Sequence, residues 1–247
     1  MAREKQDKQT ELIFGIHPIV ELLKAKQRKL TVVYTTKPEP KSWDQIVRLL
    51  PKGTQIQYVT RDVLAKLAGT TDHQGVVAFA SPFVYRKKFF DPIKQPFLLL
   101  LDSIQDPRNT GAIIRSAYCT GVQGVIIVEK AASPLTATAL KSAAGLAEHM
   151  PIYQAPSTKA AVQLLREAGY TMYMAMVDKN AQPAHMMDYA MPLCVVIGNE
   201  GAGIAPEIAR QGKTVFLPQV SPEVSYNASV AAGILLFMVA TKTQLLK

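Results

Sequence analysis

Residues 98–121 read LLLLDSIQDPRNTGAIIRSAYCTG, and this stretch decides the fold class. The four leucines form a continuous apolar run, which is typical of a parallel strand buried on both faces. A polar turn follows, and then a helix that we expect to begin near Asn109 and to end before Gly121. Because apolar strands and helices keep alternating towards the C-terminus, residues 97–247 are predicted to form an α/β domain with a parallel sheet.

The rest of this domain follows the same pattern. Further strands are expected at 125–128, 170–177 and 193–197, and helices at 136–148 and 227–245. A helix capped by Ser157 and ended by Gly169 lies between them. Ligands of such sheets bind at the carboxyl ends of the strands. No apolar run reaches the roughly 18 residues that would span a bilayer, so no membrane partner is expected.

The preceding part of the chain is predicted to form a small α/β domain over residues 12–81. Helical patterns occupy 14–24, 43–50 and 61–67, and strand patterns occupy 30–35, 56–59 and 75–80. Residues 82–96, rich in proline and basic residues, have the composition of a linker. Its RKK at 86–88 beside two phenylalanines either contacts RNA or forms a hinge with a packed aromatic pair. Residues 1–11 are expected to be a disordered tail rather than a signal peptide.

Charge is unevenly distributed along the chain. Residues 1–96 contain 17 Lys and Arg against 9 Asp and Glu, whereas residues 97–247 contain 11 against 10. A basic region attracts polyanions through counterion release, which favours a nucleic-acid partner over a merely solubilising surface. Cys119 and Cys194 lack paired spacing and are expected to be buried thiols, which places the protein in the cytoplasm.

Three clusters with chemical potential each follow a predicted strand. The first contains Asn109, a candidate helix cap, and Arg115, a cation within an apolar helix that needs either an anionic ligand or a structural salt bridge. The second, VVIGNEGAG at 195–203, is a glycine-rich turn or a plain tight turn. Glu200 occupies the middle glycine position of the dinucleotide fingerprint and would repel phosphate, but not a cationic cofactor such as S-adenosylmethionine.

The third cluster, VFLPQVSPEVSYNASVAAG at 215–233, joins a strand to a helix rich in small residues. Ser225 and Asn227 are candidate caps of that helix. In this order, the three clusters resemble the motifs of the SpoU-type, TrmH-like RNA 2′-O-ribose methyltransferases of the SPOUT superfamily. FGIHPIVELLK (14–24) and TDHQGVVAF (71–79) resemble the family's auxiliary RNA-binding domain, which is similar to a ribosomal protein fold.

The resemblance implies a deep trefoil knot in residues 97–247, a homodimer with its active site near the interface, and S-adenosyl-L-methionine as cofactor. The implied reaction methylates a ribose 2′-hydroxyl of RNA, in a guanosine of 23S rRNA. Alternatives are a tRNA substrate, a non-catalytic RNA-binding scaffold, and methylation of a base nitrogen or a protein. Neither DNA nor a metal is expected to bind. The four histidines are interpreted as structural or surface residues, and they are His17, His73, His149 and His185.

The resemblance also implies roles for individual residues. The catalytic set is Asn109, Arg115, Glu200, Ser225 and Asn227. The cofactor-binding set is Ile197, Gly198, Glu200, Gly201, Leu217, Tyr226 and Ala228. Because a guanidinium pKa exceeds about 12, we expect Arg115 to grip a phosphate and stabilise an alkoxide rather than to act as the base that the family assigns.

The chain departs from the family pattern in the third motif. Ser221, Tyr226 and Ala228 stand where the family usually has Gly, Leu and Val, and Pro222 stiffens the loop before Tyr226. Cofactor affinity and substrate choice are therefore open at this point.

Overall fold

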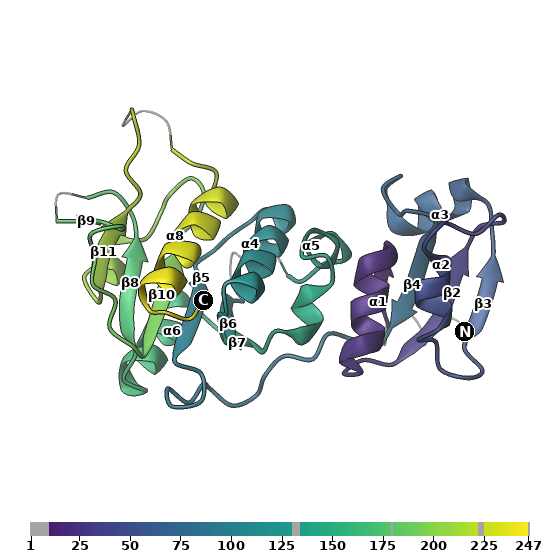
Figure 1. The fold of residues 1–247 in the computed structure, drawn as a ribbon, viewed down its shortest axis with the longest axis horizontal. Coiled ribbons are helices and arrows are strands. Elements are labelled where there is room, and N and C mark those ends of the chain that lie inside the picture. Colours follow the sequence, from purple (N-terminus) through teal and green to yellow (C-terminus); the bar gives the residue numbers. More distant parts are fainter. Residues whose placement is uncertain (1–9, 130–133, 179, 222–224, 247) are drawn as a thin grey trace. The chain divides into compact units, whose positions relative to one another are not determined.

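The computed structural model describes residues 10–129, 134–178, 180–221 and 225–246, and its fold is drawn in Figure 1. The chain forms two compact units. Unit 1 comprises Met1–Val84 together with Leu135–His149, and unit 2 comprises Tyr85–Pro134 together with Met150–Lys247. In the described ranges, no helix is long and apolar enough to cross a membrane.

Unit 2 is built on a seven-stranded parallel sheet, as the sequence predicts. Its strand order is β7-β6-β5-β10-β8-β11-β9. The strands are β5 (Phe97–Leu101), β6 (Gly124–Val128), β7 (Ile152–Ala155), β8 (Thr171–Ala175), β9 (Gln182–Pro183), β10 (Leu193–Ile197) and β11 (Lys213–Phe216). Every residue of β5, β6 and β10 is buried, which explains their unbroken apolar sequences.

Helices cover both faces of this sheet (Figure 1). They are α4 (Pro107–Cys119), α6 (Thr158–Glu167), α7 (Pro206–Ala209) and α8 (Ala228–Lys242). On one face, α6 and α7 contribute Leu165 and Ile208 to a core that also contains Leu98, Ile126 and Val196. On the other face α4 packs against α8.

The boundary between the two units falls within the predicted linker, because unit 2 begins at Tyr85. The Arg86 backbone N–H donates to the Ile152 carbonyl, 2.7 Å away, beside β7. Phe89 contacts the rings of Phe90 and Tyr153 edge-on. Phe90 is buried against Gly124, where a Cβ would lie 2.2 Å from its ring. Of the two interpretations of this stretch, the packed aromatic pair is therefore present in the structure.

Unit 1 contains a four-stranded sheet of order β1-β4-β2-β3. Its strands are β1 (Glu11–Phe14), β2 (Leu30–Thr35), β3 (Gln55–Tyr58) and β4 (Val76–Ala80), of which β2 and β3 are parallel and the other pairs antiparallel. Its helices are α1 (Ile16–Ala25), α2 (Trp43–Val47), α3 (Arg61–Ala68), α5 (Ala137–Ser142) and the 3₁₀ turn η2 (Leu146–His149).

Several boundaries differ from the sequence prediction. Phe14 ends β1 instead of opening a helix, and Glu11 is the first residue of that strand rather than part of a tail. Helix α4 begins at Pro107, because Asp106 and not Asn109 is its N-cap and accepts from the Arg108 backbone N–H. The prediction of two buried thiols is right for Cys194 and wrong for Cys119, which is exposed at the end of α4.

The Ala-rich stretch predicted as one helix is broken in the middle. Helix α5 ends before Ala144 and Gly145, whose φ angles of 51° and 81° are left-handed, and η2 follows. A Cβ on Gly145 would lie 2.8 Å from the Cα of Pro18 in α1. The break therefore lets residues 135–149 pack closely on α1, in agreement with the contacts of η2 and α5 with that helix.

A buried arginine ties this segment into unit 1. The Arg28 side chain is fully buried, and its guanidinium lies 2.8 Å from Glu148 Oε1 and 2.9 Å from Glu11 Oε2. Its Nε donates to the Ser81 carbonyl. Arg28 thus joins the Glu148 carboxylate to Glu11 of β1 and to Ser81, which follows β4, and each hydrogen bond compensates for part of its lost hydration.

Replacing Glu148 by alanine should destabilise unit 1 by about 3 kcal/mol, because a buried guanidinium would lose its buried anion. Trp43 in α2 is the single tryptophan of the chain, so urea unfolding followed by its fluorescence reports on this unit. Lys24→Ala removes an exposed partner of Glu21 and should cost less than about 1 kcal/mol. Equal unfolding midpoints for Glu148→Ala and the unchanged protein would contradict this role.

Candidate functional site

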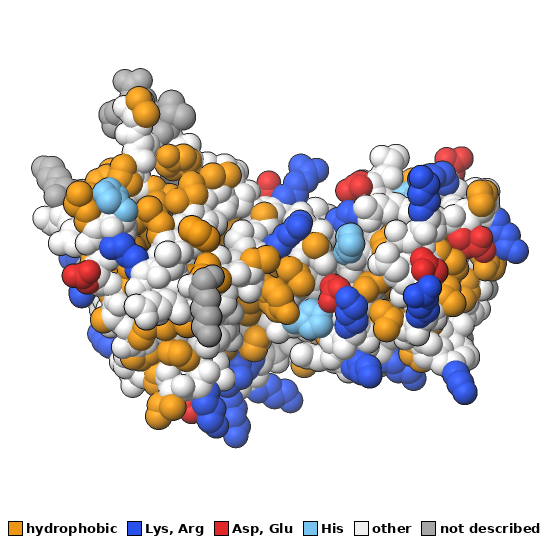
Figure 2. Space-filling model, viewed as in Figure 1, with side chains coloured by type: hydrophobic (Ala, Val, Ile, Leu, Met, Phe, Trp, Pro, Cys, Tyr) orange, Lys and Arg blue, Asp and Glu red, His pale blue; other side chains and the backbone are white. Residues whose placement is uncertain are grey.

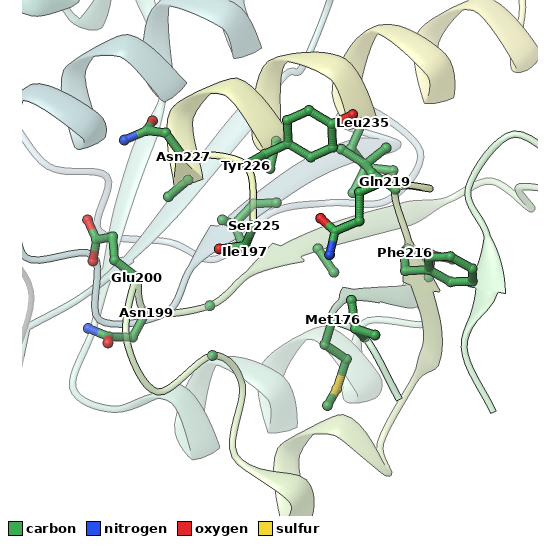
Figure 3. A pocket seen from close by; sticks show the side chains of 18 of the residues that line it. Met176, Ile197, Asn199, Glu200, Phe216, Gln219, Ser225, Tyr226, Asn227 and Leu235 are labelled. Carbon is green, nitrogen blue, oxygen red and sulfur yellow. The ribbon is translucent and has the colours of Figure 1, made fainter. Parts of the chain in front are cut away.

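A cavity of about 550 Å³ opens at one edge of the unit 2 sheet. It lies at the carboxyl ends of β8, β10 and β11, which are neighbours in the sheet, and the start of α8 closes one side (Figure 3). In parallel sheets this edge is where ligands bind, because loops diverge there and leave a crevice. The order β10-β8-β11 brings together strand ends that are far apart in the sequence.

The loop after β10 carries a fixed carboxylate. Glu200 Oε1 accepts a hydrogen bond from the Asn109 side-chain amide, 3.1 Å away, and Oε2 accepts from the Gln105 backbone N–H. Asn109 is available for this bond because Asp106 caps α4 in its place. Desolvation raises the pKa of Glu200, but these hydrogen bonds outweigh it and hold the pKa below its ordinary value. The carboxylate is thus an anion in a set orientation.

The same loop is closed by Asn199, to which the family resemblance gives no role. Its Oδ1 accepts from the backbone N–H groups of Gly201 and Ala202, and its Nδ2 donates to the Ser103 carbonyl, 2.7 Å away. Backbone bonds between Asn199 and Gly203 in both directions complete the turn. A Cβ on Gly198 would lie 2.5 Å from the Gly203 carbonyl carbon, so this turn requires glycine there.

The start of α8 forms the facing wall. Asn227 is its N-cap, with Oδ1 accepting from the Ser229 backbone N–H, so the cap prediction holds for Asn227 and not for Ser225. The Tyr226 hydroxyl donates to the Pro218 carbonyl, 3.4 Å away. Figure 3 shows Glu200 and Asn227 on one side of the cavity and Gln219 and Tyr226 on the other.

Arg115 lies outside this cavity. Its side chain is exposed, and Arg115 is not one of the described residues that line the cavity. In the described part of the chain no acidic side chain forms an ion pair with it. It follows Asn109 by six residues on α4, about 9 Å further along the helix axis. The structural salt bridge that the sequence allowed is therefore not formed in the described residues.

The structure brings together most of the residues that the resemblance singled out. The cavity is lined by Ile197, Gly198, Glu200, Gly201, Leu217, Tyr226 and Ala228, and also by Ser225 and Asn227. Asn109 joins them through Glu200.

The cavity also has lining residues that sequence reasoning missed. They are Ala175, Met176, Val177, Asn199, Gly203, Val215, Phe216, Gln219, Ala231 and Leu235. Met176 and Val177 directly follow β8, so the strand-end rule could have identified them. Pro222 lies outside the described residues.

The histidines lie apart from this cavity. His73 is buried, and its Nδ1 accepts from the Gly75 backbone N–H. His149 Nε2 lies 2.8 Å from a Glu21 carboxylate oxygen in unit 1. Within the described ranges, no group of three or more His, Cys, Asp or Glu side chains could hold a metal ion.

Comparison with known families matches the two parts of the chain to two models. Residues 96–237 match the SpoU rRNA Methylase family, and residues 12–86 match the RNA 2′-O ribose methyltransferase substrate binding domain.

Similar proteins extend over nearly the whole chain. A 23S rRNA (guanosine-2′-O-)-methyltransferase of Acinetobacter baylyi is 33% identical over 92% of this chain and 95% of its own length. The enzyme of the same description from Shewanella oneidensis is 32% identical over 93% and 96%. The crystal structure of an AdoMet-bound rRNA methyltransferase from Sinorhizobium meliloti superposes with a TM-score of 0.81 at 23% identity, covering 100% of this chain and 92% of that one.

The hydrogen bond from Asn109 makes the Glu200 carboxylate sensitive to mutation. Asn109→Ala removes a donor to the charged form and should raise the pKa of Glu200 towards its ordinary value. In the unchanged protein the bonds of the ionised carboxylate contribute stability above the ordinary pKa, and this contribution is lost as the pH falls through the lower, folded-state pKa. NMR titration of the carboxyl carbon measures the shift.

Gln163→Ala is the matched control, because it removes a side-chain amide that donates to a different carboxylate, Glu167, in the same unit. It should leave the titration of Glu200 unchanged. If Asn109→Ala also left it unchanged, the backbone N–H groups alone would hold the carboxylate.

Proposed function

Because the chain belongs to the SpoU rRNA methylase family, we propose that it transfers a methyl group from S-adenosyl-L-methionine to the ribose 2′-hydroxyl of a guanosine in 23S rRNA. The observation that carries the proposal is the cavity, since it gathers Gly198, Glu200 and Asn227 from two separate motifs at one sheet edge. Support for the rRNA substrate comes from the guanosine-specific relatives, which align with unit 1 as well as unit 2. We place this activity in the cytoplasm.

The cavity fits the proposed cofactor. Its volume lies in the usual range of small-molecule sites, about 300–1,000 Å³. Ile197, Leu217 and Leu235 offer apolar surface for a flat base, and the glycine loop after β10 exposes backbone groups for polar contacts. Glu200 contributes negative charge, which suits a sulfonium. When bound, S-adenosylmethionine would supply an activated methyl group, and no metal is required.

Two residues of the third motif that depart from the family pattern stand at the cavity itself. Tyr226 and Ala228 line it, and the Tyr226 hydroxyl bonds across the loop to the Pro218 carbonyl. We infer that this bond keeps the tyrosine ring at the cavity wall instead of in its interior, so that space for the cofactor remains.

Arg115 is proposed to act on the RNA. In the described part of the chain this exposed guanidinium has no ion-pair partner, so it is suited to bind the phosphate beside the target ribose, and to stabilise charge on the 2′-oxygen as its proton passes to solvent. A guanidinium carries only donors and no free acceptor, so Arg115 is unsuited to remove that proton itself. Its position outside the cavity agrees with a role towards substrate rather than cofactor.

We further propose a homodimer formed through α8. Val230, Ile234 and Phe237 are spaced along one side of this helix and are 49%, 36% and 58% exposed. Hydrophobic side chains gather on the face where α8 lies (Figure 2). A second copy would cover this stripe, since isologous dimers pair the same surface of both chains.

Methyl transfer is tested with radiolabelled S-adenosylmethionine and undermethylated bulk RNA, followed by nuclease digestion and nucleoside analysis. We expect label in an alkali-resistant dinucleotide from large-subunit rRNA. Arg115→Ala should reduce turnover at least about 100-fold, as expected for loss of a charge-stabilising donor, while equilibrium dialysis shows unchanged cofactor binding.

Arg115→Lys distinguishes charge from guanidinium geometry, because lysine keeps the charge but loses the bidentate bond. Arg210→Ala, an exposed arginine after α7, should leave turnover unchanged. Retained turnover in Arg115→Ala would refute its role. Label in tRNA would show that tRNA, and not 23S rRNA, is the substrate. RNA binding without cofactor affinity would indicate a non-catalytic RNA-binding scaffold.

Introducing a charge into the α8 stripe should separate the copies. Phe237→Lys should shift the mass measured by light scattering from about twice the 27.0 kDa chain mass to a single chain. Val63→Lys, at a 40% exposed apolar position in α3, should leave the mass unchanged. A single-chain mass for the unchanged protein would exclude the dimer at the concentration measured.

A further inference from the structure

A second cavity, of about 520 Å³, lies in unit 1. It is lined by Thr36, Lys37 and Pro38, which follow β2, and by residues 58–61, which end β3 and open α3. Because β2 and β3 are parallel neighbours, both segments leave the sheet at the same edge. The cavity thus stands at the carboxyl ends of parallel strands, as the cavity of unit 2 does.

An aromatic ring and two cations line this second cavity. The Lys37 ammonium lies 4.4 Å from the centroid of the Tyr58 ring, and 46% of Tyr58 is exposed. Lys37 and Arg61 are both exposed, and no described carboxylate forms an ion pair with either. Partial desolvation and the nearby acid Glu39 both raise the pKa of Tyr58 above its ordinary value.

These groups match the chemistry of an unpaired nucleotide. Sites for single-stranded nucleic acid combine cations that follow the backbone with aromatic rings against which bases stack. The Lys37 ammonium lies over the Tyr58 ring, so a base that stacks on this face displaces it towards the phosphate, and Arg61 supplies a second donor from the other segment. Surface packing alone would explain the Lys37–Tyr58 pair, but not Arg61, a second exposed cation in the same concave surface that forms no ion pair with a described residue.

We propose that this cavity of unit 1 binds one unpaired nucleotide of the RNA substrate. Lys37 and Arg61 bind its phosphates, and its base packs against the Tyr58 ring. This rests on the proposed function, since it takes RNA as the substrate. Unit 1 then selects RNA with an unpaired segment, because duplex bases stack on one another and offer no face to the ring.

The test measures binding of the full-length protein to a labelled, unstructured 12-nucleotide RNA and to the same RNA in a duplex, by fluorescence anisotropy. Tyr58→Leu keeps an apolar side chain but removes the ring. It should weaken binding of the single strand about 5-fold to 150-fold, the range of one lost base–aromatic contact, and leave duplex binding within about 2-fold.

Lys37→Gln combined with Arg61→Gln should lower the slope of log affinity against log salt concentration by about 1.4 for the single strand, about 0.7 for each lost phosphate contact. The matched control, Lys29→Gln with Lys52→Gln, removes the same charge. These two lysines precede β2 and β3, at the opposite edge of the same strands. The control should leave the slope unchanged.

Equal slopes for the two double variants would overturn the proposal, as would unchanged single-strand affinity in Tyr58→Leu. Binding is measured without cofactor, so the result is independent of methyl transfer. If the protein methylates rRNA but Tyr58→Leu leaves RNA binding unchanged, the proposed function stands and this nucleotide site is refuted. If the protein shows no transferase activity but Tyr58→Leu weakens RNA binding, the proposed function is refuted and the nucleotide site stands.

Discussion

The burial of strands β5, β6 and β10 determines where the polar side chains of unit 2 can lie. Every residue of β5, β6 and β10 is buried, so these strands carry apolar side chains apart from Gly124 and Cys194. Polar side chains that could contact a ligand therefore occur only beyond the ends of these strands. Asp102, the first residue after β5, is itself buried and accepts bonds from the Ser103 and Thr158 hydroxyls. The buried sheet thus concentrates the polar groups of unit 2 at its edge.

At that edge, two hydrogen-bonded side chains set the shape of the candidate site. Asn199 closes the loop after β10 on itself and ties it to Ser103. Glu200 then joins the loop to α4 through Asn109. Each side chain satisfies backbone groups that a glycine-rich turn would otherwise leave to water. The carboxylate is therefore held in place before any ligand arrives, which lowers the entropy cost of binding.

The sequence was most informative where a single local rule decides the structure. Strand β10, the Ser157 cap and the stop at Gly169 follow from apolar runs and cap chemistry, and all agree with the structure. The sequence did not predict the structure correctly where packing between distant segments determines it. The break at Gly145 depends on the approach to α1, and β1 is a strand because β4 lies beside it. Within the site, Gln219 carries no chemical signature, and it reaches the cavity only through the fold of the chain after β11. The trefoil knot and the dimer stay predictions.

The return of residues 135–149 to unit 1 has a consequence for protein synthesis. All four strands of unit 1 have been made by residue 84, but the unit is completed at His149, 65 residues later. At about 5–20 residues per second, the ribosome needs about 3–13 s to add them. Until then Arg28 lacks the Glu148 carboxylate, and the surface of α1 against which Gly145 packs is uncovered. During synthesis, unit 1 therefore stays incompletely folded until residues 135–149, which lie within the sequence of unit 2, have been added.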